Sequence, residues 1–116
     1  MAEVRIYHNP RCSKSRGALE ILRERGVDSE VVEYLAEPLD RDALATLLDL
    51  LPDPPSELVR RDGNFESLGL DPAGYQTAEE VIELLLAHPE LMQRPVAVRG
   101  DCAVIARPSD RVLDLL

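Results

Sequence analysis

Aromatic residues are scarce in this chain, which has no tryptophan, one phenylalanine and three tyrosines among its 116 residues. A core that cannot rely on aromatic rings must be filled by aliphatic side chains, so Leu, Val, Ile and Ala are expected to be the buried residues. The length is typical of a single domain. We therefore expect residues 1–116 to fold as one domain with one aliphatic interior.

Positive charge is also scarce, because 13 Lys and Arg face 22 Asp and Glu and the net charge is -9. Such a chain repels a nucleic-acid backbone on average, so nucleic acid is not an expected partner. No hydrophobic run is long enough to cross a bilayer, and the first residues lack the pattern of a secretory signal. The sequence predicts no membrane partner and a cytoplasmic location.

The two cysteines, Cys12 and Cys102, are too few for a disulfide framework. In a reducing cytoplasm a thiol is either part of the core or a nucleophile. Cys102 falls in a predicted strand and is expected to be buried, although it is also a candidate internal resolving thiol. With His8 and His88 the cysteines match no zinc spacing, so no metal is expected. No bound cofactor is expected either.

The first 35 residues show the pattern of a strand, a helix and a second strand. Residues 4–7 are β-branched and aromatic, apolar residues then recur at helical spacing up to Gly26, and residues 29–35 read as the next strand. A βαβ unit of this kind has parallel strands. Cys12 lies where the first strand gives way to the helix.

The rest of the chain predicts helices followed by a hairpin. We expect a helix over 41–51 capped by Asp40, and then a shorter helix from Ser56 that carries Arg60 and Arg61. Loops are expected at 63–65 and 71–74, and the Thr77–Glu80 capping box begins a helix that runs to His88. Strands over 94–99 and 102–106 are joined by a Gly100–Asp101 turn and followed by a last short helix. The predicted class is α/β. We expect a four-stranded mixed sheet with flanking helices. A helical insertion over about 40–90 separates the βαβ half from the ββα half, and this layout matches thioredoxin-like proteins.

The surroundings of Cys12 favour a reactive thiol. A helix N-terminus stabilises the thiolate, and Arg11, Lys14 and Arg16 add positive charge in an acidic chain. His8 lies four residues earlier, where a turn can bring its imidazole near the sulfur. The alternative is a small buried hydrophobic residue, which would not need flanking cations.

Two common cysteine motifs are excluded at this position. The third residue after Cys12 is Ser15, so there is no Cys-x-x-Cys pair. Position 18 is alanine, so the Cys-x5-Arg loop of cysteine phosphatases is absent as well.

Residues 7–16, with the sequence Tyr-His-Asn-Pro-Arg-Cys-Ser-Lys-Ser-Arg, resemble the opening of the glutaredoxin-linked arsenate reductases. Later segments follow in that family's order, so that the likeness covers nearly the whole chain: 33–35, 66–70, 88–89, 94–96 and 107–109. In that family a cysteine attacks arsenate, three arginines hold the oxyanion, and glutathione with glutaredoxin supplies the reducing power.

The resemblance implies a role for individual residues. Cys12 would be the nucleophile and His8 would favour its thiolate, Arg60, Arg94 and Arg107 would bind the oxyanion, and Ser15 and Pro95 would support the site. It further implies a cis peptide bond before Pro95. The loop after Arg61 is shorter than usual and lacks a proline, so Arg61 stays an alternative to Arg60.

Two other functions remain open at this point. Spx-type regulators share the fold and bind RNA polymerase, but many carry Cys-x-x-Cys, and a regulator has no chemical need for three oxyanion-binding arginines. A related thiol oxidoreductase with another substrate is harder to separate, because the same arginines would fit other tetrahedral anions.

Overall fold

The computed structural model describes residues 3–116, which form strands, α-helices and short 3₁₀-helices. In chain order they are β1 (Val4–His8), α1 (Ser13–Glu24), β2 (Ser29–Glu33), α2 (Arg41–Leu50), the 3₁₀-helix η1 (Pro55–Leu58), α3 (Gly63–Ser67), α4 (Ala78–Ala87), η2 (Pro89–Leu91), β3 (Val96–Arg99), β4 (Cys102–Ile105) and η3 (Ser109–Leu115).

The four strands form one mixed sheet, as predicted, and their order is β2-β1-β3-β4. β1 is central: Ile6 pairs with Val31 of the parallel strand β2 and with Ala97 of the antiparallel strand β3. β3 and β4 form the expected hairpin, and Gly100 in its turn has a positive φ of 61°. Glycine adopts that conformation without steric cost.

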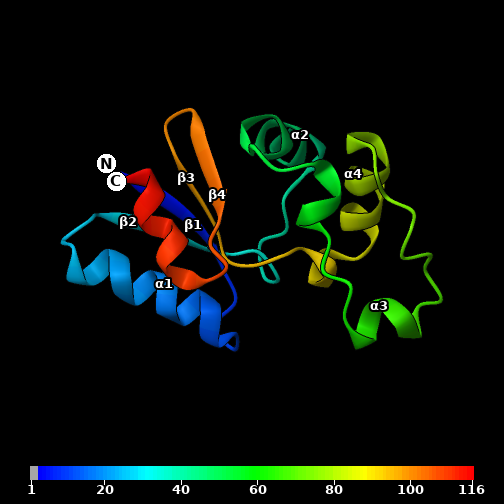
Figure 1. Ribbon diagram of the computed structural model, residues 1–116, viewed down its shortest axis with the longest axis horizontal. Coiled ribbons are helices and arrows are strands. Elements are labelled where there is room, and N and C mark those ends of the chain that lie inside the picture. The colour runs from blue at the N-terminus through cyan, green and yellow to red at the C-terminus, as the bar shows by residue number, and fades with distance from the viewer. Residues whose placement is uncertain (1–2) are drawn as a thin grey trace.

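One face of the sheet is covered by α1 and η3, which Figure 1 shows lying side by side. Residues alternate between the two faces of a strand, and Val4 and Ile6 of β1 lie on this face. They form an aliphatic core with residues from β3, β4, α1 and η3, namely Ala18, Leu19, Leu22, Ala97, Val104, Ala106 and Val112.

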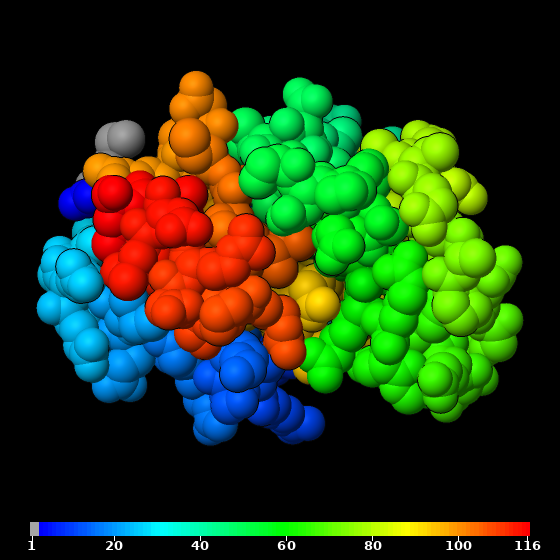
Figure 2. Space-filling view, in the orientation of Figure 1, coloured from blue at the N-terminus to red at the C-terminus, as the bar shows by residue number. Residues whose placement is uncertain are grey.

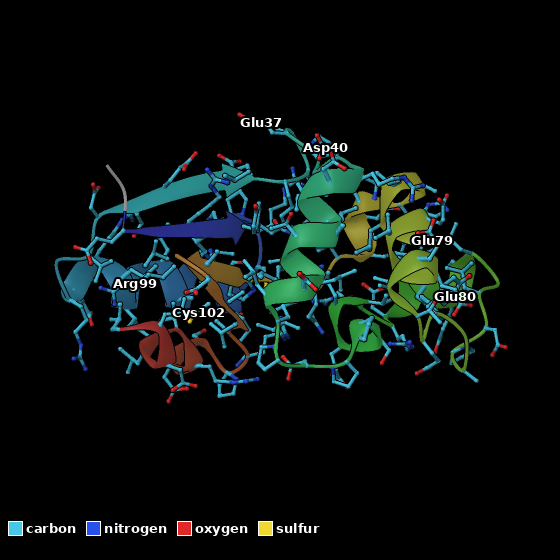
Figure 3. The ribbon with its side chains drawn as sticks, turned by 90° about the horizontal axis from the view of Figure 1, so that it is seen from above. Glu37, Asp40, Glu79, Glu80, Arg99 and Cys102 are labelled. Atoms are coloured by element: carbon cyan, nitrogen blue, oxygen red, sulfur yellow. The ribbon has the colours of Figure 1, made fainter. Side chains whose placement is uncertain are left out.

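The helical insertion packs against the other face and extends beyond the sheet, giving the molecule a long axis of 42 Å. Its core joins Tyr7 and Val96 of the sheet to the apolar sides of α2 and α4. Arg41 at the start of α2 bonds to Glu79 and Glu83 of α4 and so ties the two helices together at the surface. Figure 3 labels Asp40, the N-cap of α2, and Glu79, which belongs to α4.

Two expectations for the insertion were wrong. The predicted loop at 63–65 is the start of α3, because the Asp62 side chain caps it at the Phe65 N–H and Phe65 is fully buried. The helix expected from Ser56 ends at Leu58. The chain then becomes extended, and Val59 pairs with Met92, so Arg60 lies outside any helix.

The expectation that Cys102 is buried was also wrong. Cys102 is the first residue of β4, an edge strand, directly after the turn, and its side chain is exposed. Figure 3 shows Cys102 and Arg99 on the hairpin, away from the insertion. The Arg94–Pro95 bond is cis, as predicted, and so is Arg107–Pro108. Among residues 3–116, no helix is long and apolar enough to span a membrane.

Candidate active site

Cys12 is the N-cap residue of α1, and its backbone rather than its side chain makes the local hydrogen bonds. The Cys12 N–H donates to Asn9 O over 3.0 Å, and its carbonyl accepts from the Arg16 N–H over 3.0 Å. The side chain makes no capping bond. The sulfur is therefore available at the end of the helix where free N–H groups point outward.

The thiol of Cys12 is acidic for a cysteine. Burial raises the pKa, but the Ser15 N–H, the Arg94 guanidinium and the Lys14 N–H stabilise the thiolate more strongly and bring the pKa from 9.0 to about 7. A substantial fraction of the thiol is then ionised near neutral pH, which is the reactive form.

Arg107 reaches the same sulfur from the end of β4. Its Nη1 lies 3.9 Å from Cys12 Sγ and donates a hydrogen bond of 2.8 Å to Arg94 O. Next to it, Ser109 Oγ donates to Lys14 O over 2.8 Å, and Gly17 leaves room for this approach, because a Cβ there would lie 2.8 Å from Ser109 Oγ. The C-terminal segment is thus fixed on the first turn of α1.

Arg94 lies on the same side of the thiol. It is partly buried, and its Nε makes no hydrogen bond with any described residue. Figure 2 shows segments of four colours meeting near the centre of one face: blue from the start of α1, orange-red from the segment before η3, green from the insertion, and a recessed yellow segment between them. Arg107 contacts the thiol of Cys12 and the Arg94 guanidinium stabilises its thiolate, so cations from two separate parts of the chain act on Cys12.

The choice between Arg60 and Arg61 depends on their partners. The Arg61 guanidinium donates to the carbonyls of Ser56, Pro72 and Gly74 and stacks 5.7 Å from the centre of the Phe65 ring. The Arg61 guanidinium is thus occupied in holding the surrounding loops together.

Arg60 lies on the chain segment beside Arg94. Its backbone N–H donates to Leu91 O over 2.7 Å, and its Nε donates to Asp62 Oδ2 over 2.9 Å. One edge of the guanidinium is fixed by this ion pair, which leaves the Nη groups as donors. Arg60 as the third arginine of the site stays a prediction.

His8 is buried at the end of β1, with 6 % of its surface exposed. Burial lowers its pKa, and Arg23 and Arg16 lower it further, although Glu33 acts in the opposite direction. The imidazole is thus neutral at pH 7, and His8 is not among the groups that most affect the pKa of Cys12.

Ser15 and Pro95, the two residues expected to support the site, have different contacts. Ser15 is fully buried, its Oγ accepts from the Asn9 N–H over 3.3 Å, and its own N–H is the strongest stabiliser of the Cys12 thiolate. The carbonyl of Pro95 accepts from the Ala106 N–H over 2.9 Å, so it joins β3 to the segment that carries Arg107.

Two residues of the site were missed in the sequence. Asn9 is buried, and its side chain accepts from the Arg11 N–H over 3.0 Å, which shapes the turn before Cys12. Tyr34, which follows β2, is 1 % exposed; burial raises the pKa of its hydroxyl, and the charges of Arg94, Cys12 and Arg60 also affect that pKa. An aspartate or asparagine before a turn is a signal for the first. Tyr34 lies in the segment 33–35 that follows the family's order, but that likeness assigned it no role.

The described residues, 3–116, contain no cluster of three His, Cys, Asp or Glu side chains that could hold a metal. A cavity of about 500 Å³ lies between the sheet and α2, lined by residues such as Arg5, Tyr7 and Leu47, and it does not include Cys12. A tetrahedral oxyanion is small and needs converging donors rather than a large cavity. The arrangement at Cys12 can accept such an anion and attack it with a thiolate.

Known proteins resemble this chain over nearly its whole length. The model of the ArsC family matches residues 7–115. An arsenate reductase of Neisseria meningitidis is 36 % identical, with 97 % of each chain covered. The Escherichia coli protein YfgD, described as uncharacterized, is 40 % identical, with 98 % of this chain and 97 % of that protein covered.

The solved structure of an arsenate reductase from Vibrio cholerae superposes with a TM-score of 0.87 at 30 % identity, covering 99 % of this chain and 98 % of that one. This likeness confirms the predicted thioredoxin-like architecture and the resemblance found in the sequence. The chain belongs to the ArsC family.

Proposed function

We propose that this protein is an arsenate reductase in which Cys12 is the nucleophile and Arg60, Arg94 and Arg107 bind the oxyanion. The observation that carries the proposal is the contact between Arg107 Nη1 and Cys12 Sγ, 3.9 Å, in a chain whose net charge is -9. A thiolate held between guanidinium groups in an otherwise acidic protein is suited to an anionic substrate that it attacks.

Binding would follow from the geometry of arginine. A guanidinium stays charged and offers paired donors that match the oxygens of a tetrahedral oxyanion. The free N–H groups at the start of α1 would add a further anion-stabilising contribution. These groups would also stabilise the negative charge that shifts among the oxygens as the sulfur approaches arsenic.

The first step forms the Sγ–As bond and breaks one As–O bond, and the departing oxygen leaves as water after taking up protons. Arsenic is still pentavalent in this adduct. A second thiolate then attacks Sγ, the S–As bond breaks, and its electron pair stays on arsenic as arsenite. Cys12 is left in a mixed disulfide, which further thiol exchange returns to the thiolate.

Glutathione and glutaredoxin are the proposed source of these electrons, and the thiol pool of a reducing cytoplasm would supply them. Cys102 is a poor candidate for the second thiol. It lies at the start of β4, whereas Arg107, which contacts Cys12, follows the other end of that strand. A four-residue strand spans roughly 13 Å, and a disulfide needs Cα atoms within about 7 Å.

The test is arsenate-dependent NADPH oxidation in the presence of glutathione, glutaredoxin and glutathione reductase. Cys12→Ser is the test variant and Cys102→Ser is its matched control. We expect turnover in the wild type and in Cys102→Ser, and none in Cys12→Ser.

Turnover that survives Cys12→Ser would contradict the proposal. Absence of turnover in a wild type whose Cys12 is nevertheless reactive would favour a thiol oxidoreductase with another substrate. An unreactive Cys12 would instead favour the polymerase-binding role of Spx-type proteins.

A further inference from the structure

Tyr34 combines a buried ring with a buried hydroxyl that lacks a partner. The ring is packed in the core of the insertion with Leu44, Leu85 and Met92, and the residue is 1 % exposed. The hydroxyl makes no hydrogen bond with any described residue. Buried polar groups are nearly always paired in folded proteins, so this hydroxyl calls for a partner that is not part of the chain.

The sheet register places Tyr34 at the edge where Cys12 lies. His8 of β1 pairs with Glu33 of the parallel strand β2, so the next residues, Asn9 and Tyr34, leave the sheet together. Asn9 in turn accepts the Cys12 N–H. Because the C-terminal ends of parallel strands meet at one edge, the ring of Tyr34 and the thiol approach the same space from neighbouring strands.

The same edge is reached from the other side of β1. Val96 of β3 pairs with Tyr7, and Arg94 lies two residues before Val96. The Arg94 Nε is a second buried donor without a partner among residues 3–116. Two unpaired donors, one next to each neighbour of β1, therefore lie at the edge of the sheet where Cys12 follows β1.

The charges around the Tyr34 hydroxyl agree with this placement. Burial raises its pKa and the Cys12 thiolate also raises it, whereas Arg94 and Arg60 lower it. The side chain of Asn9 is near enough to lower the pKa too, but it does not reach hydrogen-bond geometry. The hydroxyl thus keeps its proton at neutral pH and is a donor beside two guanidinium groups.

We propose that the Tyr34 hydroxyl donates a hydrogen bond to an oxygen of the bound oxyanion, beside Arg94 and Arg60, and is a further substrate-binding residue. The inference rests on the proposed oxyanion site at Cys12. It adds one neutral donor to that site, carried by a ring that the insertion holds in place. The insertion would thereby contribute to substrate binding through Tyr34 as well as through Arg60.

The test variant is Tyr34→Phe, which removes one oxygen and keeps the ring in its packing. The matched control is Tyr75→Phe, since Tyr75 packs against the ring of Phe65 in the insertion. In each full-length protein, also carrying Cys102→Ser, the rate of Cys12 alkylation by iodoacetamide is measured at rising concentrations of inorganic arsenate. The protection curve gives a dissociation constant that does not depend on turnover.

We expect Tyr34→Phe to weaken arsenate binding by about tenfold, as for the loss of a hydrogen bond to a charged group. Its melting temperature should be unchanged or higher, because an unpaired buried hydroxyl is removed. Tyr75→Phe should bind arsenate as the wild type does. A merely structural hydroxyl could not give weaker binding together with an undiminished melting temperature.

The other outcomes overturn the inference in distinguishable ways. Equal protection of the wild type and Tyr34→Phe would refute the role of the hydroxyl and leave the oxyanion site intact. Weaker binding together with a lower melting temperature would make the hydroxyl a structural group. A wild type that arsenate does not protect at all would remove the proposed function and this inference with it.

Discussion

Arg107 contacts the thiol of Cys12 although 95 residues separate the two in the chain, with Nη1 3.9 Å from Sγ. The contact depends on the C-terminal segment. Arg107 follows the end of β4, and Ser109 Oγ donates a hydrogen bond to Lys14 O in the first turn of α1. The reactivity of the thiol is therefore a property of the folded sheet and not of the local sequence alone.

The first prediction concerns the acidity of Cys12. In a Cys102→Ser background, the rate of alkylation should rise with pH around a midpoint of about 7, because the thiolate is the reacting form. Arg94→Leu should move the midpoint upward, since the guanidinium favours the thiolate. The measurement is the pH profile of iodoacetamide modification. A midpoint near the ordinary thiol value of 9.0 in the wild type would contradict it.

The second prediction concerns His8. Because its imidazole is uncharged, it does not stabilise the thiolate electrostatically. His8→Gln should therefore shift the alkylation midpoint of Cys12 less than Arg94→Leu does. A larger shift in His8→Gln would mean that the imidazole is protonated beside the sulfur.

His8 should also affect stability in acid. Burial lowers its pKa below the ordinary 6.5, so the fold favours the uncharged ring. That contribution is complete above pH 6.5 and is lost as the pH falls through the lowered value. Between about pH 7 and pH 5 the melting temperature of the wild type should therefore fall more than that of His8→Gln. Parallel decreases would contradict this account.

The third prediction separates the neighbouring arginines. Arg61→Ala removes bonds to several loop carbonyls and the contact with Phe65, and should cost about 1–2 kcal/mol of unfolding free energy while leaving the KM for arsenate nearly unchanged. Arg60→Ala should raise that KM by about tenfold or more with a smaller effect on stability. Urea unfolding and steady-state kinetics on both variants check it. The reverse assignment would place Arg61 in the site.

Much of the fold could be predicted because its signals are local. The βαβ unit, the capping box of Thr77 and Glu80 and the final hairpin each follow from periodicity and turn residues within a short window. The same signals put Cys12 at a strand-to-helix junction.

Other features depend on contacts distant in sequence. Gly63-Asn64 has the composition of a turn, but the burial of Phe65 and the Asp62 cap make it a helix. Arg60 and Arg61 carry the same charge, and the carbonyls of Pro72 and Gly74, which are distant in sequence, help to occupy Arg61 rather than Arg60. The importance of the Tyr34 hydroxyl follows from strand register and cannot be read from a single sequence.

The fourth prediction concerns Asp62, which has two tasks in the fold. Its Oδ1 accepts the Phe65 N–H over 3.1 Å and caps α3, while its Oδ2 accepts from Arg60 Nε over 2.9 Å. Asp62→Ala removes both, whereas Asp62→Asn keeps an oxygen for the cap and loses the charge that holds Arg60. The pair of variants therefore separates helix capping from the positioning of the arginine.

We expect Asp62→Ala to lose about 1 kcal/mol of unfolding free energy, as for other N-caps, and Asp62→Asn to lose much less. Both should raise the KM for arsenate by roughly threefold to tenfold, because a freed Arg60 must be ordered again when the anion binds. Burial raises the pKa of Asp62, but the Phe65 N–H and Arg60 lower it below its ordinary 3.8, so its charge is constant at working pH. A lower KM in Asp62→Asn would instead mean that the carboxylate competes with the substrate for Arg60.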